Sequence, residues 1–241
     1  MLKTLGSIRA LAEFASFAEA VQNDHALYPI SVPRSFRLPM LAALAPTLNR
    51  PLVIVSDRLD HATRLYDEMA VWLPDGNSLL FSEPTPLFYE DSPWEMSVRR
   101  ERMQVLTLLS SYNIPFAKKP ATPPIIFTTT RALMTRTIPR RDMIRACKKL
   151  AVGGSHNPDT LFTDLYNIGY LPVDIVLEPG QVSRRGGILD IWVPSAPHPF
   201  RIEFFDVEVE SIREFDHATQ RTLRKLDDVL LTPAREFIAP L

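Results

Sequence analysis

The sequence predicts an α/β protein in which a helix-covered parallel sheet is followed by a smaller α+β domain with an antiparallel sheet. In the first part, short apolar runs alternate with stretches of helical period, and no hairpin turns separate them. After about Lys149 the apolar residues recur with period two, which is typical of half-buried antiparallel strands. A length of 241 residues, 46% of them hydrophobic, suits two moderate domains. We predict these domains over residues 1–147 and 148–232, with residues 233–241 returning toward the first.

The elements of the first part can be located from hydrophobic period and from Pro and Gly stops. One amphipathic helix is expected in the first twenty residues, where Leu5, Ile8, Ala12, Ala15 and Glu19 recur at helical spacing. Strands are predicted over Ala26–Val32, Leu52–Val55, Leu79–Phe81 and Ile125–Thr128, and helices over Leu38–Leu48, Leu59–Trp72 and Val98–Leu109. Because Leu52–Val55 is apolar throughout, we expect burial on both faces, and Asp57 can cap the next helix.

The second part holds one more helix and then strands. Asn157 and Pro158 suit a helix start, and Gly169 suits its end. Strands are predicted over Ile188–Val193, Phe200–Phe205 and Val207–Phe215, with a turn at Gly186-Gly187 and another over residues 194–199. An antiparallel sheet backed by one helix fits this pattern.

Composition narrows the functional classes. Cys147 is the only cysteine, so an intramolecular disulfide is impossible and nothing indicates an oxidising compartment. No apolar run approaches the roughly 18 to 20 residues that span a bilayer, and Glu13 and Glu19 interrupt the first segment. A formal net charge of -1 gives no global field that would hold nucleic acid. We therefore expect a cytoplasmic protein with no membrane contact.

Motifs for nucleotide, metal or acid-base chemistry are missing where the fold would place them. The loop Val32–Arg37 has no glycine and no lysine, and Pro33 removes an amide donor, which disfavours a phosphate cradle; Arg34 and Arg37 could meet an anion or be solvated. The histidines, His25, His61, His156, His198 and His217, lack metal-ligand spacing. Ser155 lacks a nucleophile elbow, and solvation is the default for Glu90-Asp91 and Asp227-Asp228. We predict no catalytic residue, cofactor or metal.

Two stretches are candidates for binding. The basic stretch comprises Arg131, Arg136, Arg140, Arg141, Arg145, Lys148 and Lys149; Arg140, Arg141 and Arg145 could make weak DNA phosphate contacts, or the run could be a solvated helix face. In Phe200–Phe205, alternation places Arg201, Glu203 and Phe205 opposite the core. An aromatic side chain beside an arginine is typical of an interface hot spot, but Phe205 could also pack under a loop. Parity leaves open whether Arg184 or Arg185 faces outward.

The same residues carry a family resemblance. Residues 185–191 (RGGILDI), 201–206 (RIEFFD) and 208–212 (EVESI) resemble linked blocks shared by UvrB and the bacterial transcription-repair coupling factors, the Mfd family. Residues 65–69, 215–216 and 219–223 agree as well, so the likeness covers nearly the whole chain. UvrB has an intact phosphate loop and a long aromatic hairpin, whereas this chain has the loop Val32–Arg37 and a short loop around Pro84–Trp94. The coupling factors are therefore the better match.

That resemblance implies a degenerate RecA-like (P-loop-fold) domain without a Walker A motif, interrupted by a UvrA-binding domain. By motif position, the UvrA contacts are Arg185, Arg201 and Phe205, and the chain is expected to be a fragment without catalysis. In the full-length family members, a motor using ATP and Mg, contacts to RNA polymerase and double-stranded DNA, and a carboxy-terminal domain covering the UvrA site lie in other regions. The alternative is a UvrB-like or helicase-type ATPase fragment that acts on damaged DNA.

Overall fold

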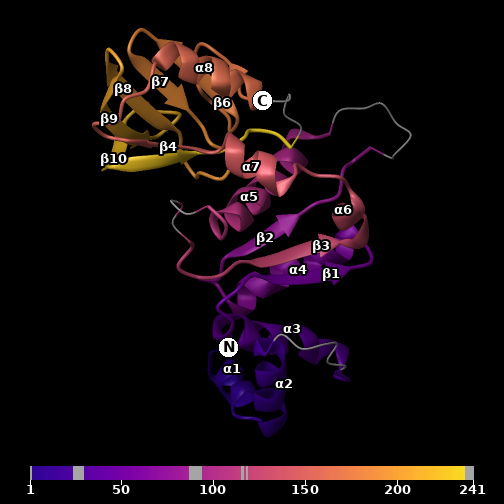
Figure 1. Ribbon diagram of the computed structural model, residues 1–241. Helices are drawn as coiled ribbons and strands as arrows, with labels where there is room; N and C mark the ends of the chain where they lie inside the picture. Colours follow the sequence, from indigo (N-terminus) through magenta and orange to yellow (C-terminus); the bar gives the residue numbers. More distant parts are fainter. Residues whose placement is uncertain (1, 24–29, 87–93, 115–116, 118, 237–241) are drawn as a thin grey trace. The chain divides into compact units, whose positions relative to one another are not determined.

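The computed structural model describes residues 2–23, 30–86, 94–114, 117 and 119–236 (Figure 1). The chain forms two compact units that alternate along the sequence. Unit 1 comprises Met1–Pro84 and Pro120–Thr135, and unit 2 comprises Thr85–Lys119 and Arg136–Leu241. The domain boundary predicted near residue 148 stays a prediction.

The start of unit 1 consists of two helices where one was predicted. Helix α1 (Leu2–Arg9) and helix α2 (Ala12–Gln22) are separated by a turn at residues 10–11. The turn shifts the helical phase, so the predicted stripe through Ala12 and Ala15 is wrong: both are exposed. The larger apolar side chains of Phe14 and Phe17 are buried in their place, together with Leu5 and Ile8 of α1.

Unit 1 also contains the predicted parallel sheet. Its strands are β1 (Leu52–Ser56), β2 (Ser78–Phe81) and β3 (Ile125–Thr129), in the order β1-β3-β2 with both pairings parallel. Helix α4 (Leu59–Trp72) packs across all three strands, and α3 (Arg34–Leu44) packs on α1 and α4 and continues into a 3-10 turn, η1 (Ala45–Thr47). The short helix α6 (Thr130–Met134) follows β3 (Figure 1). The parallel arrangement is confirmed.

Two local predictions for this sheet are wrong. Strand β1 is not buried on both faces: Val53 and Val55, on one face, are 46% and 50% exposed, whereas Leu52 and Ile54, on the other face, pack against the core. Burial on both faces belongs to the central strand β3. Asp57 does not cap α4, whose N-cap is Arg58; its carboxylate lies 3.3 Å from His61 Nδ1 instead.

Some predicted features fall outside the described residues. Most of the strand expected over Ala26–Val32 does, and the described residues 30–33 form no strand. His25, the pair Glu90-Asp91 and residues 87–93 of the loop around Pro84–Trp94 also lie outside. Within the described part of the chain, no helix is long and apolar enough to cross a membrane.

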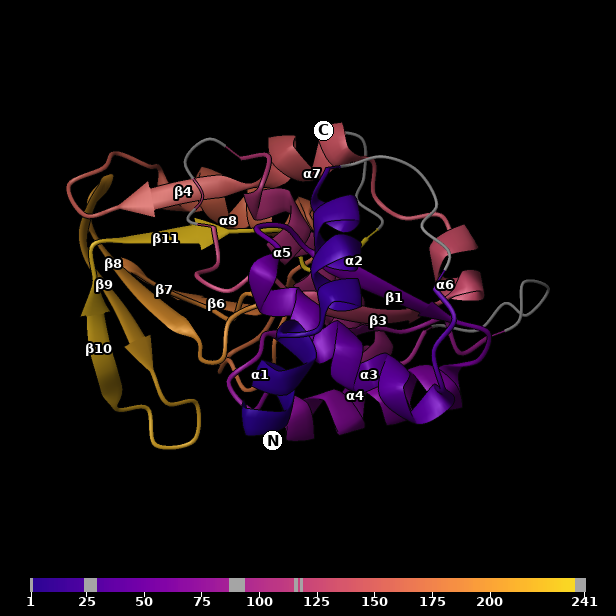
Figure 2. The same ribbon diagram turned by 90° about the horizontal axis from the view of Figure 1, so that it is seen from below.

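Unit 2 is built on a six-stranded sheet in the order β10-β9-β8-β7-β6-β5. Its strands are β5 (Leu171–Pro172), β6 (Gln181–Arg185), β7 (Ile188–Ile191), β8 (Phe200–Phe205), β9 (Glu208–Phe215) and β10 (Thr222–Leu226). Neighbours are antiparallel except β5 and β6, which are parallel. Strand β4 (Lys148–Ala151) pairs with β11 (Asp228–Leu231) as a separate ribbon (Figure 2). Helices α5 (Met96–Ser111), α7 (Arg140–Ala146) and α8 (Pro158–Asn167) complete the unit.

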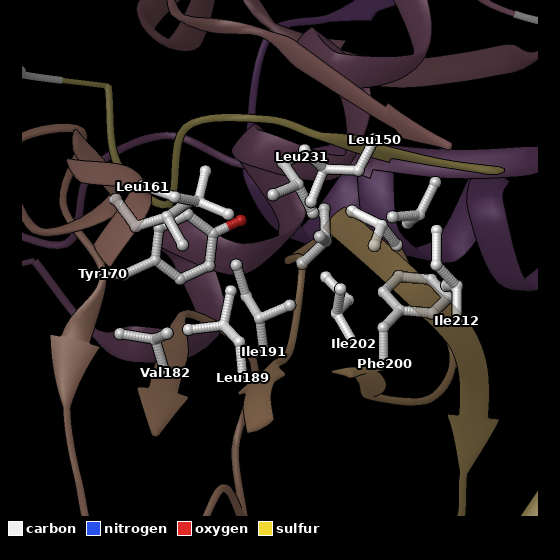
Figure 3. Close-up of a cluster of buried hydrophobic side chains, with 14 of the residues drawn as sticks. Leu150, Leu161, Tyr170, Val182, Leu189, Ile191, Phe200, Ile202, Ile212 and Leu231 are labelled. Atoms are coloured by element: carbon white, nitrogen blue, oxygen red, sulfur yellow. The ribbon is translucent and has the colours of Figure 1, made fainter. Parts of the chain in front are cut away.

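The core of unit 2 lies on one face of this sheet. Figure 3 shows side chains of β6 to β9, among them Leu189 and Ile202, directed toward Leu161 of α8 and Leu150 and Leu231 of the ribbon. Helix α8 begins as predicted: the Asn157 side chain accepts hydrogen bonds from the amides of residues 159 and 160, and Pro158 occupies the first turn. Because α8 and the ribbon lie over this face, the opposite face of β6 to β9 carries most of the sheet's polar side chains.

A buried ion pair joins α5 to the segment after β11. The side chains of Arg102 and Glu236 are 0% and 3% exposed, and Arg102 Nη2 donates to Glu236 Oε2 at 3.1 Å. A charged pair this deeply buried holds its two segments together firmly, because either partner alone would be an uncompensated buried charge.

Candidate functional site

The alternation predicted for β8 is confirmed. Phe200, Ile202 and Phe204 are buried in the core, whereas Phe205 is 77% exposed and does not pack under a loop. The face of the sheet opposite α8, here called the outer face, carries Arg185 of β6, Asp190 of β7, and Arg201, Glu203 and Phe205 of β8. Exposing a phenyl ring to this degree has no folding benefit, which makes Phe205 a candidate contact for a partner.

The two arginines of the outer face share one carboxylate. Asp190 lies opposite Arg201 in the β7–β8 register, and its side chain is only 4% exposed. Arg201 donates from Nε and Nη2 to the two Asp190 oxygens at 2.7 and 2.8 Å, a bidentate pair. Arg185 Nη2 donates to Asp190 Oδ2 at 3.2 Å. The carboxylate is therefore satisfied by two cations on the strands that flank it.

Arg201 makes further contacts that confine its guanidinium. Its Nη2 also donates to Gln220 Oε1 at 3.0 Å, and the guanidinium carbon lies 4.6 Å from the centre of the Phe215 ring. The hydrogen bonds to Asp190 raise the pKa of Arg201, partly offset by burial. The side chain of Arg201 is 21% exposed, so most of its surface contacts its own domain and not solvent.

Arg184 and Arg185 point to opposite faces of the sheet. Arg184 forms an ion pair with Asp159 in the first turn of α8, on the helix side. Arg185 belongs to the outer face, and its side chain is 57% exposed. Parity could not decide between the two, because the Gly186-Gly187 turn follows them directly.

The turn between β6 and β7 depends on both glycines. Gly186 has φ +60°, a left-handed conformation that glycine adopts without strain. At Gly187, a Cβ atom would stand 2.6 Å from the carbonyl oxygen of Phe204, and the Phe204 amide donates to the Gly187 carbonyl at 2.7 Å. This close approach of β7 to β8 sets the position from which Phe205 projects.

The rest of the outer face is a mixture of paired charges and one apolar neighbour. Glu203 accepts a hydrogen bond from the Ser211 hydroxyl at 2.7 Å and pairs with Arg213 of β9. Ile188, 36% exposed, lies opposite Glu203 in the register and therefore diagonally from Phe205. Phe205 and Ile188 thus place apolar surface next to the exposed part of Arg185.

The basic stretch is not gathered onto this face. Arg140, Arg141 and Arg145 are exposed on α7, and within the described residues no carboxylate partner is recorded for them. Lys148 and Lys149 are instead paired with acidic residues of unit 2, Asp164 and Asp228 respectively. The arginines of α7 therefore remain candidates for weak anion contacts, whereas the two lysines form ion pairs within unit 2.

The region where a nucleotide would be sought lies in unit 1. Pro33 is the N-cap of α3 and provides no side-chain cap, and Arg34 and Arg37 lie in the first turn. They line a groove with Arg58 and Arg64 at the end of β1, but both of these pair with Asp60. No Gly-rich loop faces this groove among the residues described.

Other titratable groups lack a catalytic arrangement. Cys147 is buried, and burial raises the pKa of its thiol to about 12, so it is a poor nucleophile. Among the described residues there is no group of three or more His, Cys, Asp and Glu side chains that could hold a metal ion. The predicted absence of a metal or cofactor stays a prediction.

Sequence reasoning missed Asp190, Gln220 and Ile188 as parts of the site. Asp190 did carry a signal, since it is the one acidic residue inside the apolar run Ile188–Val193. Gln220 carried none, because it reaches Arg201 only through the fold of the β9–β10 turn, where its own φ is +61°.

Comparison with known proteins identifies relatives of this chain. Residues 149–237 match the UvrB interaction domain family. The transcription-repair-coupling factor of Bacillus subtilis is 31% identical over 205 residues, which cover 85% of this chain and 17% of that protein. Those of Escherichia coli and Myxococcus xanthus are 28% and 31% identical over 82% and 83% of the chain and 16% of each protein. The chain thus spans about a sixth of the length of these curated relatives.

Proposed function

Because this chain is similar, over 82–85% of its length, to bacterial transcription-repair-coupling factors, and its residues 149–237 match the UvrB interaction domain family, we propose that it is a module that recruits the repair protein UvrA. It binds UvrA through the outer face of β6 to β9 and links stalled transcription to nucleotide excision repair. The module performs no catalysis of its own. The observation that carries this proposal is Phe205, an aromatic side chain that is 77% exposed in the middle of a domain matching the UvrB interaction family.

The physical basis is a mixed apolar and cationic surface. Phe205 and Ile188 can enter an apolar hollow of the partner, while the exposed part of Arg185 meets a carboxylate beside it. Aromatic and arginine side chains dominate the energetics of such interfaces. The surrounding pairs, such as Glu203 with Arg213, satisfy each other and add specificity more than affinity.

The test is calorimetric titration of the whole chain into purified UvrA. We expect a saturable complex that Arg185→Glu weakens by at least about tenfold, since the charge reversal places the new carboxylate against the carboxylate of the partner. Arg141→Glu on α7 is the matched control, because it makes the same change at an exposed arginine outside the outer face. Failure of the unmodified chain to form a complex would overturn the proposal.

We also propose that unit 1 is a degenerate RecA-like fold that binds no nucleotide. The parallel order β1-β3-β2 with α4 across it supports the fold, and Pro33 together with the lack of glycine and lysine in Val32–Arg37 supports the loss of nucleotide binding. Thermal melts with and without Mg-ATP test this, because a ligand that binds the native state must raise the melting temperature. A rise of several degrees would favour the alternative, a UvrB-like or helicase-type ATPase fragment acting on damaged DNA.

Contacts to nucleic acid by this chain are proposed to be weak. Arg140, Arg141 and Arg145 offer only three exposed cations on one short helix, so retention of DNA should disappear at moderate salt. A motor using ATP and Mg, contacts to RNA polymerase and double-stranded DNA, and a carboxy-terminal domain that covers the UvrA site are proposed for the whole protein and lie in regions other than this chain.

A further inference from the structure

The outer face contains a buried carboxylate, that of Asp190, which is not among the proposed contacts with the partner. Asp190 exposes 4% of its side chain, and a carboxylate at that depth is stable only when its oxygens are hydrogen-bonded and its charge is compensated. Three donated hydrogen bonds meet this need, two from Arg201 and one from Arg185. The arrangement costs desolvation of Asp190 and of most of Arg201, so it calls for an explanation beyond stability.

The geometry divides the two arginines into different roles. Arg201 uses Nε and Nη2 on Asp190, uses Nη2 again on Gln220, and stacks on Phe215, which leaves 21% of its side chain exposed. Arg185 gives one hydrogen bond to Asp190, and more than half of its side chain, 57%, faces solvent. Arg185 therefore has donors left for a partner, whereas the donors of Arg201 are largely engaged within the domain.

We propose that Asp190 is a positioning residue of the partner-binding face. It holds Arg201 and Arg185 as one unit, so that Arg201 acts through Asp190 and does not itself provide the main contact. The direct contacts are then Arg185 and Phe205, and the partner must present a carboxylate beside an apolar hollow. This inference rests on the proposed function, because the surface is defined by UvrA binding.

Fixing Arg185 before the encounter favours binding by reducing the rotamer entropy lost when the complex forms. A long side chain anchored at one donor has fewer conformations to lose than a free one. Anchoring at Asp190 also places the guanidinium over β7, on the strand that carries Ile188, so the cationic and apolar contacts keep a fixed spacing.

The experiment combines affinity with a measurement that needs no partner. Asp190→Asn keeps the shape of the side chain and removes its charge, and Asp159→Asn is the matched control, because Asp159 also pairs with an arginine, Arg184, but on the α8 side. Calorimetry with UvrA is run on the unmodified chain, both variants, Arg185→Ala, and the double variant Asp190→Asn/Arg185→Ala. Nitrogen-proton spectra of the arginine Nε groups in the free chain report whether Arg201 stays hydrogen-bonded.

We expect Asp190→Asn to weaken UvrA binding about tenfold, the loss typical for a charge-assisted hydrogen bond, and Asp159→Asn to leave it unchanged. If Asp190 acts through Arg185, the double variant should bind about as weakly as the weaker single variant, since coupled residues are not additive. The Arg201 Nε–H should exchange with solvent faster in both variants that carry Asp190→Asn than in the unmodified chain, and Asp159→Asn and Arg185→Ala should leave its exchange unchanged. A purely structural role for Asp190 would instead give losses that add.

A second variant guards against misfolding of Asp190→Asn. Gln220→Asn tolerates the left-handed backbone at this position but is too short to reach Arg201, so it loosens the same unit from outside the core. It should weaken binding severalfold, because Arg201 loses one of its hydrogen bonds while those to Asp190 remain. The inference is overturned if Asp190→Asn or Gln220→Asn binds UvrA like the unmodified chain, or if the losses in the double variant add. If the unmodified chain does not bind UvrA, the proposed function itself fails.

Discussion

Truncation of Phe205 gives the sharpest test of the outer face. In Phe205→Ala, the fold should change little, because a ring that is 77% exposed contributes few packing contacts; we expect a loss of at most about 0.5 kcal/mol in the free energy of unfolding. Binding should change far more. Burying a phenylalanine removes about 150 Å² from water, which at about 25 cal/mol per Å² is worth roughly 4 kcal/mol before any cost of binding. Ordering and imperfect fit reduce it, so we expect about 2 kcal/mol, or about thirtyfold in Kd.

The assay is titration calorimetry with UvrA at fixed salt, with urea unfolding as the check on stability. Tyr166→Ala is the control: Tyr166 is an aromatic residue of the same unit, 56% exposed, but it lies on α8 and so on the other side of the sheet. It should bind like the unmodified chain. Equal affinities for Phe205→Ala and Tyr166→Ala would refute the reasoning, and so would a large loss of stability in Phe205→Ala.

Three further expectations concern the fold. Glu236→Gln should lower the free energy of unfolding by about 3 kcal/mol in urea titrations, because Arg102 keeps its buried charge but loses this counter-charge. Gly187→Ala should cost about 2 kcal/mol in the same assay, since the new methyl group would meet the Phe204 carbonyl oxygen; no change would show that the turn can shift freely. The Cys147 thiol, with a pKa of about 12 raised by burial from an ordinary 9.0, should resist thiol reagents at pH 8 until the chain is unfolded, and should destabilise the fold as pH rises above 9; rapid labelling of the native chain would contradict this.

Much of the fold could be predicted, because the hydrophobic period and the Pro and Gly stops indicated the same helices and strands. The helix over Leu59–Trp72 and the strand over Phe200–Phe205 have a clear period, and α4 and β8 follow them residue for residue. The first helix was misjudged because Leu5, Ile8, Ala12 and Ala15 form a stripe only if the helix is continuous, and a turn at residues 10–11 carries no Gly or Pro. The edge position of β1 was also invisible, since an apolar run does not reveal how many strands will flank it.

The site was predictable only as far as local alternation reaches. Parity alone placed Phe205 outward, and family likeness alone singled out Arg185. What parity could not show is that Arg201 faces a buried carboxylate, because the pairing of Asp190 with Arg201 depends on the register of β7 and β8. The role of Gln220 depends on a turn that closes back over the sheet, which no short-range pattern encodes.

The path of the chain determines how this module can be excised. It passes from one unit to the other after Pro84, after Lys119 and after Thr135, so no single proteolytic cut releases either unit whole. A recombinant piece that starts at residue 149, where the family match begins, would lack α5 and α7. Glu236 would then lose its ion-pair partner, Arg102. Grafting the outer face onto another scaffold therefore requires α5 and α7 to be transplanted with it.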